Sequence, residues 1–307
     1  MSDFRLLMLS AMYENGGNTT HRFLDGHPQL FVYPFESQLG TRHVQDHWSS
    51  TFPLKYRWPE FLAGATPRED FQAMIDEETK VRARTPQVSK FRHAPFELDD
   101  EGRAARFAEL CEGRPQTRAR NVEAFYRATF DAWRDRRASG REQVVVGYSP
   151  VVVVDGAKLL ADLPAAHLVH VVRNPWSAYA DTKRRPVPLG LARYLQLWCL
   201  NQYFALTLAR RHPERVHLLR LEDLLADPQA TLGRLLAKLG LEGDPALARP
   251  SFNGEELPEV YPWGTLRRVS PGDNRATAQE LSAEERQAVG EWAWQLLEPL
   301  GYADFWA

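Results

Sequence analysis

Four apolar runs in the sequence lack the alternation of polar and apolar residues that is typical of a strand with one face in water. A strand that is covered on both faces of a parallel sheet has this continuous apolar character. Helical patterns lie between the runs, so the order of elements predicts a three-layer α/β/α fold with a mostly parallel central sheet. The runs are RLLMLS (5–10), QVVVGYSPVVVV (143–154), HLVHVV (167–172) and VHLLR (216–220), and LFVY (30–33) is a further short strand.

Helix signals separate these strands. Thr66 and Glu69 form a capping box with proline at the first helical position, and Ser282 with Glu285 forms a second box that opens a terminal helix. The segment from about residue 40 to 140 is mostly helical. We therefore expect one domain of residues 1–307, with a helical insertion over about residues 40–140. Other helices are predicted from Asn18, Pro175, Gly190 and Pro228.

Composition limits the class of partner. The apolar content of 44% and the charged content of 25% are ordinary for a globular protein, and the net charge of -2 argues against a role in binding duplex nucleic acid. Cys111 and Cys199 suggest neither a disulfide framework nor a metal site, and both are expected to be buried thiols. The apolar run near Met1 is too short for a signal peptide or a membrane span, so a cytoplasmic protein is expected. Nothing in the sequence indicates the oligomeric state.

The first strand is followed by the stretch MYENGGNTT, a glycine-rich turn that enters a helix. Glycines allow the backbone to approach a ligand, and the N–H groups of a first helical turn can receive an anion. The turn lacks the full GxxxxGK[ST] pattern, because no lysine follows the glycines. A phosphate site and a plain tight turn therefore both remain open. The candidate ligands are Asn15, Gly16, Gly17, Asn18, Thr19 and Thr20.

A second strand-to-helix junction lies in VHVVRNPWSAYADTKRR, which begins at Val169. Arg173 leaves the strand, Pro175 occupies a first helical position and Ser177 lies in the first turn. The planar guanidinium of an arginine suits a doubly charged phosphate at a helix end. The alternative is an arginine that is paired with a carboxylate at the edge of the sheet.

Together the two junctions resemble the sulfotransferase family, whose members transfer a sulfuryl group from 3'-phosphoadenosine 5'-phosphosulfate (PAPS) to a hydroxyl or amine. The resemblance rests on segments that follow one another in family order over nearly the whole chain. These are the N-terminal strand and the loop ending RFLDGHPQL, the VVRNP junction, LLRLEDLLADPQATLGRLLAKLGL (218–241) and the tail GTLRRVSPGDNRATAQELSAEE.

The resemblance implies a fold of the P-loop-like sulfotransferase type and roles for the candidate residues. The loop from Asn15 to Thr20 would cradle the 5'-phosphosulfate, and Arg173 would hold the 3'-phosphate with help from Ser177. Arg267 and Arg268 would close over the nucleotide, or else form a solvated basic pair. The product would be 3',5'-adenosine bisphosphate.

Three positions depart from the family pattern. Glu14 and Asn15 stand where a cation usually precedes the glycine, so Glu14 must point away from the loop or be countered by a cation from elsewhere. Asp181 replaces a serine that often contacts the 3'-phosphate, and Leu221 replaces a frequent tyrosine. The candidate cations nearest in sequence are His21, Arg22, Arg42 and Lys55.

A base must accept the proton of the acceptor. Glu36 follows the short strand and lies near the place where some family members carry a catalytic carboxylate, although a surface or salt-bridged glutamate is the alternative. His43 and His47 are the next candidates.

The acceptor is left open between a carbohydrate, a lipid and another small molecule. The segment 40–95, on the acceptor side of the insertion, mixes aromatic and basic residues that suit any of them. A PAPS-dependent sulfotransferase is the leading hypothesis. The alternatives are a P-loop nucleotide kinase or nucleotidase and a non-catalytic binding protein of the same fold.

Overall fold

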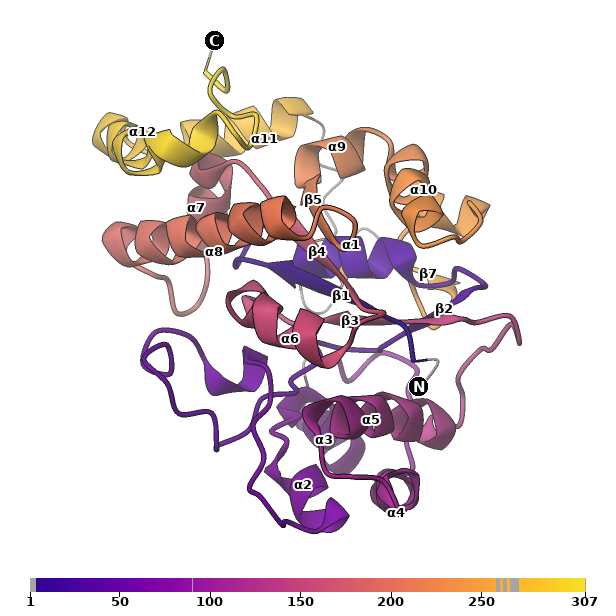
Figure 1. Cartoon of the computed structure of the whole chain (residues 1–307). Coiled ribbons are helices and arrows are strands. Elements are labelled where there is room, and N and C mark those ends of the chain that lie inside the picture. The colour runs from indigo at the N-terminus through magenta and orange to yellow at the C-terminus, as the bar shows by residue number, and fades with distance from the viewer. Residues whose placement is uncertain (1–3, 90, 258–259, 262–263, 266–270, 307) are drawn as a thin grey trace.

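A computed structural model describes residues 4–89, 91–257, 260–261, 264–265 and 271–306. Five parallel strands form its central sheet in the order β2-β3-β1-β4-β5 (Figure 1). This order places β1, which precedes the first predicted junction, at the centre and next to β4, which precedes the second. The strands are β1 (Leu6–Ala11), β2 (Leu30–Val32), β3 (Val144–Tyr148), β4 (His167–Val172) and β5 (Val216–Arg220).

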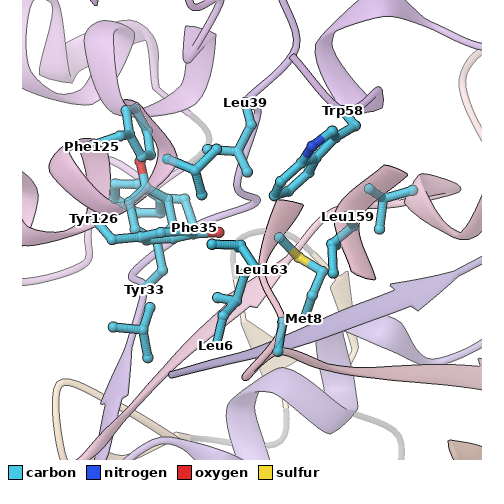
Figure 2. Close-up of a cluster of buried hydrophobic side chains, with 14 of the residues drawn as sticks. Leu6, Met8, Tyr33, Phe35, Leu39, Trp58, Phe125, Tyr126, Leu159 and Leu163 are labelled. Carbon is cyan, nitrogen blue, oxygen red and sulfur yellow. The ribbon is translucent and has the colours of Figure 1, made fainter. Parts of the chain in front are cut away.

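Helices cover both faces of this sheet, so the predicted three-layer α/β/α arrangement is confirmed. Leu7 and Leu9 of β1 pack with apolar residues of α1 (Gly17–Leu24), α9 (Leu221–Ala226) and α10 (Pro228–Lys238). Leu6 and Met8 point to the opposite face, where Figure 2 shows them with aromatic and aliphatic side chains. The helices on that face are α5 (Arg118–Ala132), α6 (Gly156–Asp162) and α8 (Leu191–Arg211).

Between β2 and β3 the chain forms no α-helix until residue 67 and is then mostly helical as far as residue 132, and this segment lies below the sheet in Figure 1. The capping box at Thr66 is present: its hydroxyl accepts from the N–H of Glu69, and the Glu69 carboxylate accepts from the N–H of Thr66. The packing is tight around Phe107 of α4, which is fully buried. The helices before α5 are α2 (Pro67–Ala73), α3 (Glu77–Arg84) and α4 (Asp100–Cys111), with short turns η1 (Leu54–Tyr56) and η2 (Pro86–Val88).

The run 143–154 is only half strand, which corrects the sequence prediction. β3 ends at Tyr148, and residues 152–155 form the short 3-10 turn η3 (Val152–Asp155). Pro150 has no N–H to donate to a neighbouring strand, and Val151 adopts the left-handed backbone conformation with φ 58. Val152 and Val153 of the turn are buried by packing and not by strand pairing, so their apolar character alone could not separate the two structures.

The C-terminal helices close one end of the molecule. α11 (Pro271–Gln279) packs on α7 (Pro175–Lys183), and α12 (Ala283–Leu297) packs on α8. The second capping box is confirmed, since Ser282 and Glu285 exchange the expected hydrogen bonds. Before these helices lie the short turn η4 (Pro245–Ala248) and two small antiparallel pairs, β6 (Ser251–Phe252) with β7 (Glu255–Glu256) and β8 (Val260–Tyr261) with β9 (Gly264–Thr265).

No helix within the described ranges is both long and apolar enough to cross a membrane. Those residues also hold no group of three or more histidine, cysteine, aspartate or glutamate side chains that is arranged to bind a metal ion. Both cysteines are free thiols. Cys111 is buried as expected, whereas Cys199 is only partly buried on α8.

Candidate active site

The glycine-rich turn lies at the carboxyl end of the central strand β1, where parallel sheets commonly bind ligands. Gly16 has φ 88 and forms the N-cap of α1, and Gly17 is the first residue of that helix. A Cβ atom at Gly16 would overlap the side chain of Leu221, and one at Gly17 would overlap the ring of Tyr148. Both positions therefore require glycine, because neighbouring elements approach the backbone directly.

The N-terminus of α1 carries no side-chain cap. The N–H groups of Gly17, Asn18 and Thr19 belong to the first turn, where an α-helix offers no acceptor of its own. Asn18 and Thr19 are partly exposed, so a ligand can reach this turn. The uncapped donors and the positive end of the helix dipole make the turn suitable for an anion.

Asn15 connects the two predicted junctions. Its side-chain oxygen Oδ1 accepts hydrogen bonds from the backbone N of Arg173 at 3.0 Å and from Nε1 of Trp198 at 3.2 Å, and its amide donates to the carbonyl of Tyr13. Asn15 is fully buried. Thr20 is also buried, and its hydroxyl donates to the carbonyl of Gly16. These two predicted ligands thus hold the loop in shape, while the junctions lie side by side.

Arg173 is buried next to the glycine loop, and its guanidinium contacts three groups of the protein. Nη1 lies 2.6 Å from Oδ2 of Asp181 and donates to the carbonyl of Glu14, and Nε donates to Oδ1 of Asn274. Nη2 is buried, and among the described residues it has no hydrogen-bond partner. The carboxylate pairing that the sequence left as an alternative is therefore present, and no described residue bonds one nitrogen of the fork.

Ser177 lies in the first turn of α7, as the sequence indicated. Its hydroxyl is buried and donates to the backbone carbonyl of Asn274, at 2.6 Å. α11 therefore packs over both Ser177 and Arg173. The predicted contributions of Arg267 and Arg268 lie outside the described residues.

The charge of Glu14 is countered by Arg185, which sequence analysis did not identify. Nε of Arg185 lies 3.7 Å from Oε1 of Glu14, and its guanidinium lies over the ring of Tyr13. The cations proposed from the sequence have other positions: His21 and Arg22 are buried, Arg42 is exposed and Lys55 binds Glu77. The only sequence signal for Arg185 is the basic run that ends α7, and nothing in that run indicates which loop it meets.

Glu36 is partly exposed, after the short strand β2. Its Oε2 accepts a hydrogen bond from the hydroxyl of Tyr56 at 2.7 Å, and within the described chain no group bonds its Oε1. Burial raises the pKa of Tyr13 to about 12; the charge of Arg185 opposes this rise, and the charge of Glu36 adds to it. Burial and then the charge of Glu36 also raise the pKa of Tyr148, whose ring covers Gly17. These effects place the Glu36 carboxylate within electrostatic reach of the loop.

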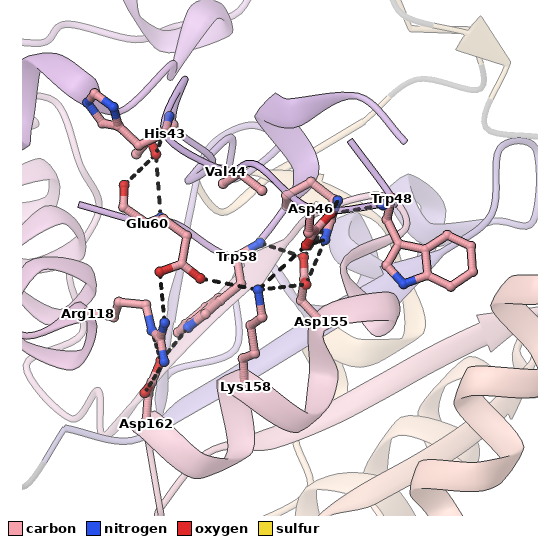
Figure 3. Close-up of polar contacts among 12 residues, drawn as sticks. His43, Val44, Asp46, Trp48, Trp58, Glu60, Arg118, Asp155, Lys158 and Asp162 are labelled. Carbon is pink, nitrogen blue, oxygen red and sulfur yellow. Dashed lines mark hydrogen bonds and ion pairs between the residues drawn. The ribbon is translucent and has the colours of Figure 1, made fainter. Parts of the chain in front are cut away.

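His43 lies apart from this group. Its backbone N–H donates to the hydroxyl of Thr41, and in the described part of the chain no contact joins it to the glycine loop. Figure 3 shows His43 near Glu60, at the end of a polar network. His47 is exposed, with its ring 4.5 Å from that of Trp48. Of the three candidate bases, only Glu36 lies beside residues that contact the loop.

The network in Figure 3 holds the segment that carries these histidines against the sheet. Arg57 is fully buried and binds Asp155 at 2.6 Å and Asp46 at 2.8 Å. Lys158 of α6 reaches Glu60 at 3.2 Å. The segment between β2 and α2 is thereby connected to η3 and α6, beside the carboxyl end of β3.

A comparison with known protein families identifies the family of the chain. A family profile described as "Sulfotransferase family" matches residues 16–245. The chain belongs to the sulfotransferase family.

A comparison with solved structures concerns the fold. The sulfotransferase domain of the olefin synthase from Synechococcus PCC 7002 superposes with a TM-score of 0.56 and 18% identity, covering 97% of this chain and 94% of that one. The sulfotransferase domain of the curacin biosynthetic pathway gives a TM-score of 0.49 and 14% identity, with 94% and 96% covered. At these identities the likeness concerns the fold alone. No curated protein sequence matches the chain significantly.

In this sulfotransferase the two predicted junctions lie side by side, with an uncapped helix end beside a buried arginine, and Glu36 accepts a hydrogen bond from Tyr56 within electrostatic reach of the loop. Sequence reasoning missed Arg185, Tyr56 and Asn274, because each comes from an element that only the folded chain brings to the loop. The arrangement offers donors for a negatively charged group and a carboxylate that can accept a proton.

Proposed function

We propose that this sulfotransferase transfers a sulfuryl group from PAPS to a hydroxyl of a small-molecule or carbohydrate acceptor. One observation carries the proposal: the uncapped N-terminus of α1 lies next to the buried Arg173, and Asn15 joins the two. A doubly anionic nucleotide needs two positive sites that are held at a fixed separation, and here one buried hydrogen bond sets that separation.

Backbone groups and side chains would bind different parts of the nucleotide. The N–H groups of Gly17, Asn18 and Thr19 would hold the phosphosulfate and stabilise the negative charge on the phosphate as it leaves. Arg173 would bind the 3'-phosphate. Arg185 neutralises Glu14, so this carboxylate does not oppose an anion in the loop.

Glu36 is the proposed base. The acceptor oxygen forms a bond to sulfur while its proton passes to a carboxylate oxygen of Glu36, and the bond between sulfur and the bridging oxygen of the donor breaks. Tyr56 donates to Oε2, which orients the carboxylate and leaves Oε1 to receive the proton. The charge of Glu36 also acts on Tyr148, whose ring covers Gly17, and this supports a role for Glu36 beside the glycine loop.

The test is incubation of the purified chain with PAPS and a panel of acceptors, with no divalent metal. The panel contains a phenol, a hydroxylated lipid, a simple sugar and an amine, and 3',5'-adenosine bisphosphate is measured by chromatography. We expect the bisphosphate and a sulfated acceptor in equal amounts. Binding of PAPS without product for any acceptor would favour a non-catalytic binding protein.

A nucleotide kinase is the remaining alternative. It needs a loop lysine and an acidic Mg²⁺ ligand, but Asn18 and the two threonines follow the glycines here. ATP and Mg²⁺ binding together with no affinity for the bisphosphate would overturn the sulfotransferase proposal.

A further inference from the structure

Asp181 lies where an anion would meet Arg173. Its Oδ2 is 2.6 Å from Nη1 of Arg173, and the two side chains are only 5% and 10% exposed. Asp181 is in the last turns of α7, and Arg173 directly precedes that helix. A charge-assisted bond of this length in a buried position is a strong contact, because little water competes with it.

The second carboxylate oxygen of Asp181 forms an ion pair with a different arginine, Arg184. Oδ1 lies 2.8 Å from Nη1 of Arg184, which is 43% exposed and also binds Glu280. The carboxylate thus bridges a buried arginine and a surface arginine. If the Asp181 carboxylate is displaced from Arg173, it remains paired with Arg184. The displacement therefore does not create an unpaired buried carboxylate.

The remaining face of Arg173 is partly closed. Asn274 of α11 accepts from Nε, whereas Nη2 is buried and is bonded by no residue that the structure describes. A phosphate that used the planar fork of Arg173 would satisfy Nη2, and it would have to replace Asp181 at Nη1. The resident carboxylate and an incoming phosphate therefore compete for one cation.

We propose that Asp181 determines specificity at the nucleotide site: its carboxylate competes with the 3'-phosphate of the donor for Arg173. The residue lowers the affinity for nucleotides with a 3'-phosphate and has little effect on nucleotides with a 3'-hydroxyl. This inference rests on the proposed function, because it takes Arg173 as the group that binds the 3'-phosphate.

The experiment measures binding by titration calorimetry on the full chain, with 3',5'-adenosine bisphosphate and 5'-AMP as the two probes. The variants are Asp181→Asn and Asp181→Ser, which both remove the carboxylate. Asparagine keeps the shape of the side chain, and the smaller serine also leaves space for a phosphate beside Arg173. Glu280→Gln is the matched control, since it removes a carboxylate from Arg184 and leaves Arg173 untouched. Circular dichroism melts establish that each variant is folded.

We expect both Asp181 variants to bind the bisphosphate about tenfold more tightly or better, the difference of one charge-assisted bond. The affinity for 5'-AMP should stay within about twofold, and Glu280→Gln should behave as the unchanged chain with both probes.

Two results would overturn the inference in different ways. If the unchanged chain binds the bisphosphate and both folded variants bind it equally or more weakly, Asp181 is a structural partner of Arg173 and the inference alone fails. If neither the unchanged chain nor the variants bind either nucleotide, the proposed function fails and the inference with it.

Discussion

Glu14 illustrates how the role of a single charged residue depends on its partners. It adopts the left-handed conformation with φ 60, its carbonyl accepts from Arg173, and its carboxylate lies near Arg185. In isolation a carboxylate beside a phosphate-binding turn is unfavourable. In the folded chain the same residue orders one arginine through its backbone and is neutralised by another through its side chain.

Replacement of Glu36 by glutamine tests the proposed base. Because glutamine keeps the shape but cannot take up the acceptor proton, we expect turnover to fall by about a hundredfold or more. The affinity for 3',5'-adenosine bisphosphate should not change, since Glu36 receives a hydrogen bond from Tyr56 and does not belong to the proposed nucleotide contacts. Steady-state kinetics and calorimetry measure the two quantities.

The matched control is Glu78→Gln. The Glu78 carboxylate accepts from the backbone N–H of Glu36, so this variant removes an equal charge from the same neighbourhood. Equal losses of turnover in both variants would mean that the local charge matters and that Glu36 is not the base.

At the scale of elements, local sequence signals located helix starts more reliably than strand ends. Both predicted capping boxes are formed, since four consecutive residues contain all the atoms that the motif needs. The end of β3 was misjudged, because the valines after Pro150 are as apolar as those before it. Their conformation depends on contacts with β1, where the N–H of Val153 donates to the hydroxyl of Ser10.

Ser282→Ala should show what a capping box contributes to α12. We expect the free energy of unfolding to fall by about 1 kcal/mol, because the N–H of Glu285 loses its acceptor. Ser282→Asp is the control and should lose much less, since aspartate is also a favoured cap. Urea titration followed by circular dichroism measures both. An equal loss in the two variants would contradict an effect of the cap.

In the whole molecule, Arg57 connects the segment after β2 to the turn after β3. The hydrogen bond from Arg57 lowers the pKa of Asp46 from 3.8 to about 2. A carboxylate with a lowered pKa in the folded state stabilises the fold above its unfolded pKa. This contribution is complete above about pH 4 and is lost as the pH falls through about 2.

Arg57→Met should therefore change both stability and its dependence on pH. We expect the free energy of unfolding at neutral pH to fall by about 3 kcal/mol, because the buried Asp155 keeps only the more distant Lys158, at 3.7 Å, as a cation. The loss of stability between pH 4 and 2 should become shallower in the variant. Urea unfolding over a pH series measures this. Arg106→Met is the control: its ion pairs are exposed, and it should cost less than about 1 kcal/mol. Equal costs would contradict a special role for Arg57.

Sequence alone determined the parallel sheet, the capping boxes and the two strand-to-helix junctions, because periodicity, caps and glycine turns act over a few neighbouring residues. It also identified Arg173 and Glu36 as candidates and noted that Asp181 departs from the family pattern. Only the tertiary structure decided that Asp181 pairs with Arg173, that Arg185 reaches Glu14 and that Asn274 covers Ser177. The physical reason is that electrostatic and hydrogen-bond energies depend on distance in space, which the separation of two residues along the chain does not set.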